Sequence, residues 1–246
     1  MKVKLVQYFD NPNPEDLDNQ PRQLHFANVA ERRKNNIPKN NCGIDEVITY
    51  NKESLKKNNF YGRNKEILKM PRGAGMWLWK PFIVLDALQQ SDPDDIIFYY
   101  DCNHNDFSKT NISVLVDYVK KQGNLFHETR WGAERLWTKR DLFVTMDCNH
   151  EKYFDSEQVQ ATWFFLKNNE QNISFVKEWL HNCCIKQNIC GGSTEIYSKF
   201  KEHRSHREDQ SILSLLCKKR NCNIFTGHPD TNKNKNVQAF INNFNP

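Results

Sequence analysis

The segment that most constrains the fold is the run Ile96-Ile97-Phe98-Tyr99-Tyr100, which contains only β-branched and aromatic residues. A continuous apolar run of this length is typical of a strand that is buried on both faces of a sheet. The run leads directly into Asp101. We therefore expect a central strand that delivers a carboxylate at its carboxyl end, the edge at which open α/β sheets bind their ligands.

Strand and helix patterns alternate along the rest of the chain. Apolar runs predict further strands at residues 3–9, 46–50 and 160–166. The spacing of apolar residues predicts helices within residues 20–36, 72–88, 112–121, 168–180 and 211–218. This alternation places the chain in the α/β class. Because we find no internal repeat or linker, we expect one domain over residues 1–230 and a loosely ordered Asn- and Lys-rich tail over residues 231–246.

The first predicted helix combines an apolar side with a charged one. Leu24, Val29 and Ala30 form the apolar side and are expected to face inward. The run Glu31-Arg32-Arg33-Lys34 forms the other side. We interpret this run as a solvated helix face, because a charge run on a helix usually faces water.

Composition excludes several classes of protein. The 246 residues carry 35 Lys and Arg against 30 Asp and Glu, a formal charge of +5. Because these basic residues are dispersed, a nucleic-acid-binding module is only an alternative. No apolar run reaches the roughly 18–20 residues of a membrane span, and the amino-terminal segment reads as a strand rather than a signal peptide. We expect a cytoplasmic location, in the cell or in a virus-infected host cell, where the eight cysteines stay thiols.

The end of the central strand is a candidate metal site. Asp101 and Asn103 are two oxygen donors two residues apart, and both can reach one hard cation such as Mn²⁺ or Mg²⁺. His228 is a candidate for a compensating third ligand. An aspartate that caps a turn would explain the same strand end, so both interpretations stay open.

A second candidate site lies at the start of the helix within residues 72–88. Gly73 and Gly75 allow close approach of the backbone, and the nearby Arg72 and Lys80 suit an anionic pyrophosphate at a helix amino terminus. The segment lacks the preceding strand and the third glycine of a dinucleotide-binding fingerprint, which excludes a Rossmann dehydrogenase. The neighbouring tryptophans are equally compatible with a place in the core.

A third candidate site precedes the last predicted helix. Glu208 and Asp209 follow a run rich in His and Arg. Acids at this position stabilise a helix amino terminus, which is one explanation. A carboxylate flanked by cations also suits a ligand hydroxyl or a proton-transfer role.

Three separated segments together resemble one family. They are Gly73-x-Gly75-x-Trp77-x-Trp79-Lys80-Pro81, Tyr99-Tyr100-Asp101 and His206-Arg207-x-Asp209-Gln210-Ser211. This combination resembles nucleotide-sugar-dependent glycosyltransferases with the GT-A fold, of the surface or capsular polysaccharide type found in bacteria and large DNA viruses. The resemblance implies a GT-A-like single domain with a mixed, mostly parallel central sheet and helices on both faces.

The resemblance also implies an activity. A sugar would move from a nucleotide-sugar donor, a UDP-sugar by expectation, to a glycan or glycoprotein acceptor with the help of Mn²⁺ or Mg²⁺. The chain departs from a strict D-x-D metal motif, because Tyr99 or Asn103 stands where a second Asp is expected. A homologue that binds sugar nucleotides without turnover is therefore the other alternative.

The resemblance also implies roles for specific residues. Asp209 and Glu208 are the catalytic candidates, and whether the reaction inverts or retains configuration is left open. The metal ligands would be Asp101, Asn103 and His228. The residues expected at the donor are Tyr8, Phe9, Arg72, Gly73, Gly75, Trp79, Lys80, Ala161, Thr162, Arg207 and Gln210. We interpret the segment from Asn124 to Trp137 as a loop that contributes to specificity.

Overall fold

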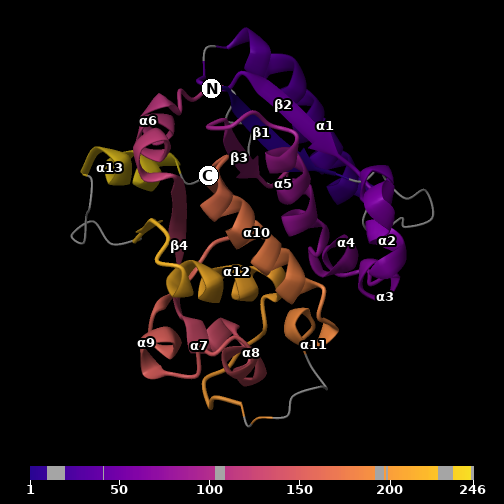
Figure 1. Ribbon diagram of the computed structural model, residues 1–246, viewed down its shortest axis with the longest axis vertical. Coiled ribbons are helices and arrows are strands. Elements are labelled where there is room, and N and C mark those ends of the chain that lie inside the picture. Colours follow the sequence, from indigo (N-terminus) through magenta and orange to yellow (C-terminus); the bar gives the residue numbers. More distant parts are fainter. Residues whose placement is uncertain are drawn as a thin grey trace.

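A seven-stranded sheet organises the part of the chain that the computed structural model describes, which is residues 1–9, 20–40, 42–102, 109–191, 197, 199–226 and 235–244. The strands are β1 (Val3–Tyr8), β2 (Glu46–Tyr50), β3 (Ile96–Tyr100), β4 (Asn124–Ala133), β5 (Glu157–Val159), β6 (Trp163–Lys167) and β7 (Ile224–Phe225). Their order is β2-β1-β3-β6-β4-β5, and β7 pairs with β4. Helices lie over both faces of this sheet (Figure 1).

The sheet is mixed. Strands β1, β2, β3, β4 and β7 point one way, whereas β5 and β6 run antiparallel to their neighbours. The expected α/β class and the mixed, mostly parallel sheet with helices on both faces are confirmed. The predicted strands at the start of the chain and at residues 46–50 and 96–100 also form as expected.

The helices follow the predicted alternation with the strands. The longer ones are α1 (Gln20–Asn36), α5 (Trp79–Gln89), α6 (Ser113–Gln122), α10 (Glu170–Cys183), α12 (Glu208–Lys219) and α13 (Lys235–Phe244). The short ones are α2 (Phe60–Arg63), α3 (Lys65–Leu68), α4 (Gly73–Met76), α7 (Glu134–Trp137), α8 (Arg140–Thr145), α9 (Glu151–Phe154) and α11 (Lys186–Ile189). Two 3₁₀ segments, η1 (Ile37–Lys39) and η2 (Glu53–Asn59), flank β2. No helix in the described ranges has the length and hydropathy that crossing a membrane requires.

Alternating side chains of β3 build a core on each face of the sheet. Ile97 and Tyr99 pack in the cluster that includes residues of α5, α10 and α12. Ile96, Phe98 and Tyr100 face the other cluster, which includes residues of α6 and α13. Each fully buried large apolar side chain contributes about 1.5–3 kcal/mol to stability. Because β3 is anchored on both faces, the position of Asp101 at its end is well determined.

The charged side of α1 was predicted to face water, but one of its residues is buried. Arg33 is fully buried, and its Nη1 donates hydrogen bonds to the carbonyl oxygens of Asp101 at 3.1 Å and Tyr100 at 3.4 Å. Its guanidinium also lies over the Tyr100 ring, 4.5 Å from the ring centroid. Leu24, predicted to face inward, is 54% exposed, whereas Val29 is buried as expected. The Arg33 side chain thus extends from α1 to the end of β3 and binds the carbonyl groups there.

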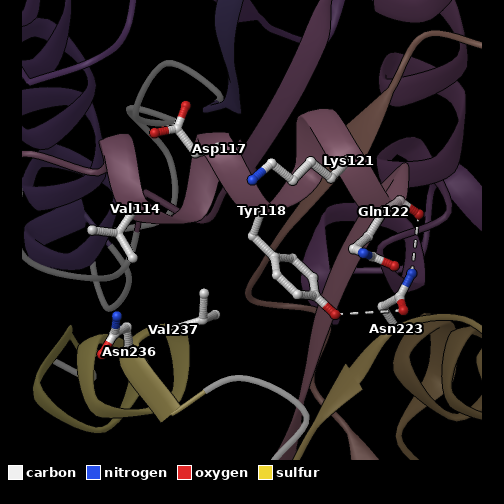
Figure 2. A pocket seen from close by; sticks show the side chains of 8 residues that line it. All are labelled: Val114, Asp117, Tyr118, Lys121, Gln122, Asn223, Asn236 and Val237. Atoms are coloured by element: carbon white, nitrogen blue, oxygen red, sulfur yellow. Dashed lines mark hydrogen bonds between the residues drawn. The ribbon is translucent and has the colours of Figure 1, made fainter.

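Part of the predicted carboxyl-terminal tail is helical. Residues 235–244 form α13, which packs against α6 and buries Val237 and Ile241. A hollow of about 470 Å³ lies between these two helices (Figure 2). Its charged side chains, Asp117 and Lys121, are both exposed. It therefore lacks the buried carboxylates and amines from which a reactive site is built.

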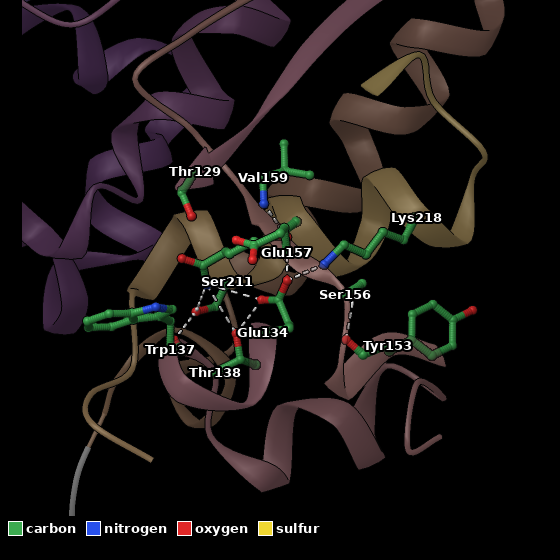
Figure 3. Close-up of polar contacts among 12 residues, drawn as sticks. Thr129, Glu134, Trp137, Thr138, Tyr153, Ser156, Glu157, Val159, Ser211 and Lys218 are labelled. Atoms are coloured by element: carbon green, nitrogen blue, oxygen red, sulfur yellow. Dashed lines mark hydrogen bonds and ion pairs between the residues drawn. The ribbon is translucent and has the colours of Figure 1, made fainter. Parts of the chain in front are cut away.

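A buried carboxylate joins the end of β4 to α12 (Figure 3). Glu134 is fully buried, accepts a hydrogen bond from Ser214 Oγ at 2.6 Å and forms an ion pair with Lys218. One turn earlier in α12, Ser211 Oγ donates to the carbonyl oxygen of Trp137 at 2.8 Å. These contacts fix the first turn of α12, which carries the third predicted motif, against α7.

Candidate functional site

A pocket of about 570 Å³ lies at the carboxyl end of β3 and is bounded by α4, α5, β4, the β5–β6 connection and the start of α12. It is lined by Arg72, Trp77, Lys80, Asp101, Glu128, Arg130, Trp131, Gln160, Ala161, Thr162, Trp163, Ser205, Arg207, Glu208, Asp209 and Gln210. All three sequence segments of the predicted site contribute to this lining. The pocket therefore brings together residues that are up to 138 positions apart, from 72 to 210.

A buried lysine connects the first and third segments. Lys80 is 2% exposed, and its Nζ lies 3.4 Å from Asp101 Oδ1, 3.3 Å from Asp209 Oδ2 and 3.1 Å from the carbonyl oxygen of Ala161. The hydroxyl of Tyr99 also donates to Asp101 Oδ1. Asp101, Lys80 and Asp209 thus form one charged cluster on the pocket wall.

The charges in this cluster depend on one another. Burial alone would lower the pKa of Lys80, but the carboxylates of Asp101 and Asp209 outweigh burial and raise it, so the side chain stays an ammonium. Burial raises the pKa of Asp209 to about 7, although Lys80 acts in the opposite direction. A carboxyl group that titrates near neutral pH in a pocket is a feature of reactive sites.

Arg72 and Glu208 form a second pair at the pocket wall. The Nε of Arg72 lies 2.6 Å from Glu208 Oε1, and its Nη2 lies 3.3 Å from Oε2. Burial raises the pKa of Glu208, against the lowering effect of Arg72. The carboxylate is directed to Arg72 and makes no capping hydrogen bond to the backbone of α12. Glu208 lies in the first turn of α12, as the cap interpretation expects, and its carboxylate also links the turn before α5 to α12.

Aromatic rings hold a third cation. The guanidinium of Arg207 lies 4.2 Å from the ring centroid of Trp131 and 4.3 Å from that of Trp137. Trp131 is 47% exposed and lines the pocket together with Arg207. Contact with the two indole rings orients the guanidinium and leaves its charge in place. The pocket thus has a pre-ordered cationic group next to Trp131 and Trp137.

Amide groups fix the floor of the pocket. Gln210 Oε1 accepts a hydrogen bond from the Ala161 amide at 3.2 Å, and its Nε2 donates to Gln158 Oε1 at 2.7 Å. The carbonyl oxygen of Thr162 accepts from the Asp101 amide at 2.8 Å. Ala161, Thr162 and Gln210 therefore lie in the pocket, as predicted, with their backbone or amide groups already ordered.

Five residues predicted at the donor are not among the pocket-lining residues: Tyr8, Phe9, Gly73, Gly75 and Trp79. The Tyr8 and Trp79 rings stack at 4.0 Å, and Trp79 Nε1 donates to the carbonyl oxygen of Gly73 at 2.9 Å. Gly75 has a φ of 101°, and a Cβ there would lie 2.7 Å from the Cα of Leu68. These contacts account for the aromatic and glycine residues through packing of the α4 turn, and their role in donor binding stays a prediction.

His206 is part of the scaffold. Its Nδ1 accepts from the amide of Lys139 at 3.4 Å, so its protonated Nε2 donates to the carbonyl oxygen of Asn188 at 2.9 Å. Burial and the nearby Lys139 lower the pKa of this imidazole to about 3. A neutral ring with both nitrogens engaged holds the segment before α12 in place.

Sequence reasoning missed the contribution of β4. Glu128, Arg130 and Trp131 all lie on this strand and line the pocket, whereas the segment was interpreted as a loop. Burial raises the pKa of Glu128 to about 7, Glu157 acts in the same direction, and Lys218 opposes both. Most buried positions of β4 lie together in its first half and do not alternate with exposed ones, so no period-two pattern marked the strand.

The predicted metal site is only partly within the described residues. Asn103 and His228 lie outside them. Within the described ranges, no group of three or more His, Cys, Asp or Glu side chains is arranged to hold a metal ion. The Nζ of Lys80 lies within 3.4 Å of both Asp101 and Asp209, so an ammonium group already bridges those carboxylates. Binding of Mn²⁺ or Mg²⁺ through Asp101 stays a prediction.

Comparisons with known proteins give distant similarities only. No protein-family model matches the chain, and no curated protein does. Among nine matching solved chains is apo mouse xyloside xylosyltransferase 1, with 11% identity, a TM-score of 0.47 and coverage of 92% of this chain and 85% of that one. Another is 4-diphosphocytidyl-2C-methyl-D-erythritol synthase from Anaerococcus prevotii, with 10% identity, a TM-score of 0.42 and coverage of 99% and 95%. A third is mannose-6-phosphate isomerase from Helicobacter pylori, with 9% identity, a TM-score of 0.36 and coverage of 92% and 91%. Similarity at this level does not define an activity.

Proposed function

We propose that this chain is a glycosyltransferase that moves a sugar from a nucleotide-sugar donor, of the UDP-sugar class, to a hydroxyl group of a glycan or glycoprotein. The observation that carries this proposal is convergence in one pocket. Lys80, Asp101 and Asp209 come from the three separate segments that resemble the GT-A family, and their charged groups are in contact there.

The chemistry of the pocket supports a phosphate leaving group. When the bond between the sugar and the diphosphate breaks, negative charge develops on the diphosphate. Arg72, Lys80 and Arg207 line the pocket and place fixed positive charge in a partly enclosed site. Preordered charge of this kind is usually the largest contribution to catalysis. Asp209 and Glu208 remain the catalytic candidates of the family resemblance, and each is held by one of these cations.

The proposal is tested by ligand-induced stabilisation. UDP-, GDP- and CDP-sugars are added to the full chain with Mn²⁺, with Mg²⁺ and with EDTA, and the shift in Tm is followed by calorimetry. A ligand at 100 times its Kd stabilises the folded state by about 2.7 kcal/mol. We expect a shift with one nucleotide class, lost in Asp101→Asn and kept in the matched control Asp117→Asn on the exposed face of α6. If no sugar nucleotide shifts the Tm with any metal or without one, the proposal is wrong.

The alternative of binding without turnover rests on Tyr99. This residue takes the place of the first aspartate if Asp101 is the second of a D-x-D motif, and Asn103 takes the place of the second if Asp101 is the first. The Tyr99 hydroxyl donates to Asp101 Oδ1. A non-catalytic homologue would show the Tm shift without release of UDP. Measuring UDP release in the same samples separates the two functions.

A further inference from the structure

Three of the four carboxylates that line the pocket are held by a cation. Asp101 and Asp209 both lie within 3.4 Å of Lys80 Nζ. Glu208 forms its two hydrogen bonds with Arg72. If any of these carboxylates took up a proton, an existing ion pair would lose its charge. They are therefore suited to hold cations and sugar hydroxyl groups in position.

Glu128 is the fourth carboxylate, and its surroundings differ. It lies on β4, across from Val159 of β5, and its side chain is half-buried in the same pocket. No Lys or Arg of the described residues forms an ion pair with it. The charged groups that act on it from neighbouring elements are Lys218 of α12 and Glu157 of β5. Its carboxylate is thus available to a ligand that enters the pocket.

The position of Glu128 also fits contact with an acceptor. Its strand neighbours Arg130 and Trp131 line the same pocket, and Trp131 is 47% exposed at its mouth. Exposed indole rings next to polar groups are well suited to stack against sugars, because the ring supplies an apolar face. Two of the leaving-group cations, Lys80 and Arg72, come from the segment around α4 and α5, whereas the third, Arg207, lies 4.2 Å from the ring centroid of Trp131.

We infer that Glu128 is the general base that accepts the proton of the acceptor hydroxyl, in a reaction that inverts configuration at the sugar. This inference rests on the proposed glycosyltransferase function. The hydroxyl oxygen forms a bond to the anomeric carbon while its proton moves to the Glu128 carboxylate. The bond between that carbon and the phosphate oxygen breaks, and its electron pair leaves with the nucleoside diphosphate.

The protonation behaviour of Glu128 agrees with this role. A general base works best when its pKa lies near the working pH. Burial raises the pKa of Glu128 to about 7, and the negative charge of Glu157 contributes to the rise. The rate of transfer should therefore increase with pH through about 7.

The test compares variants of the full chain with the UDP-sugar that gives the largest Tm shift and a panel of 4-nitrophenyl glycosides as acceptors. We expect Glu128→Gln to lower kcat for UDP release by about 100- to 10,000-fold, the usual contribution of general base catalysis. Its Kd for the donor should stay within about threefold of the parent value, which shows that the variant folds. Glu151→Gln, an exposed change on α9, is the matched control and should leave kcat unchanged.

Two further measurements separate a base from a structural residue. Glu157→Gln should move the rise of kcat to lower pH, because it removes a charge that raises the pKa of Glu128. The product of the parent enzyme should have the inverted anomeric configuration by NMR. A retained configuration, or a Glu128→Gln variant with more than a tenth of the parent kcat, overturns the inference and leaves the transferase proposal intact. If the parent chain binds no donor and releases no UDP, the general-base inference and the glycosyltransferase proposal are both wrong.

Discussion

Lys80 Nζ and Asp209 Oδ2 lie 3.3 Å apart on the pocket wall, and their side chains are only 3% and 5% exposed. Such buried pairs add little net stability compared with apolar residues, because both charges lose their hydration. A pair of this kind at the edge of a pocket is therefore better explained by function. The third partner, Asp101, extends the pair to the end of β3.

Replacing Lys80 should show how far the buried carboxylates of Asp101 and Asp209 depend on its positive charge. In Lys80→Met the two carboxylates lose their cation, and we expect the free energy of unfolding to fall by about 3–5 kcal/mol. Lys80 lowers the pKa of Asp209, so its loss raises that pKa above about 7. A carboxyl pKa that is higher in the folded state favours folding at low pH, so the loss should be larger at pH 8 than at pH 6. Urea unfolding at the two pH values measures the difference, and equal losses would contradict this account.

His206 should make stability depend on pH in the acidic range. Its pKa is about 3 in the folded state, against an ordinary value of 6.5. Between these values unfolding takes up a proton, so the free energy of unfolding should fall as pH decreases from 6.5 towards 3. The slope for one proton approaches about 1.4 kcal/mol per pH unit.

The His206→Gln variant isolates this contribution. An amide side chain can still accept from Lys139 and donate to Asn188, but it does not titrate. Urea unfolding between pH 4 and pH 7 should show a shallower slope for His206→Gln than for the parent chain. The exposed His25→Gln serves as the control, and identical slopes for parent and His206→Gln would show that His206 is not the group responsible.

Local patterns in the sequence predicted the strands that place Asp101. The run Ile96–Tyr100 is apolar throughout, and a strand buried on both faces needs no long-range information to be recognised. Local patterns also predicted α1, whose expected limits agree with the structure. The motif residues Lys80 and Asp209 were assigned to one site by family resemblance, and the structure brings them into contact.

The remaining features depend on tertiary contacts. Arg33 lies in a charged run that the sequence predicts to be solvated, and its burial is explained by tertiary contacts of its side chain with Tyr100 and Asp101. Buried and exposed positions do not alternate along β4, so no strand pattern pointed to Glu128 as a site residue. The pairing of Arg72 with Glu208 joins positions 136 residues apart, a relation that no local pattern contains.

Arg33 should act as a positioning residue for the end of β3. In Arg33→Met the carbonyl groups of Tyr100 and Asp101 lose their buried donor, and an unsatisfied buried polar group costs about 1–3 kcal/mol. We expect lower stability and a weaker donor-induced Tm shift. Arg32→Met, the exposed neighbour on the same helix, is the matched control. Loss of stability without any change in donor affinity would limit the role of Arg33 to packing.

Any side chain at Gly75 should destabilise the fold, because backbone strain and a steric clash would both act there. Its φ of 101° strains any L-residue, and a Cβ would lie 2.7 Å from the backbone of Leu68. Gly123→Ala is a control that separates these costs, since Gly123 also has a positive φ of 88° but a Cβ there would lie 3.7 Å from Asn169 Nδ2, an ordinary van der Waals distance.

For Gly123→Ala we expect a loss of about 1–2 kcal/mol from backbone strain alone. Gly75→Ala should lose about 1–3 kcal/mol more, because overpacking adds to the strain. Thermal unfolding of both variants measures the difference. If the two losses are equal, the close approach of α4 to α3 does not restrict Gly75. The conformation of the Arg72 turn would then depend on the backbone angles of its glycines alone.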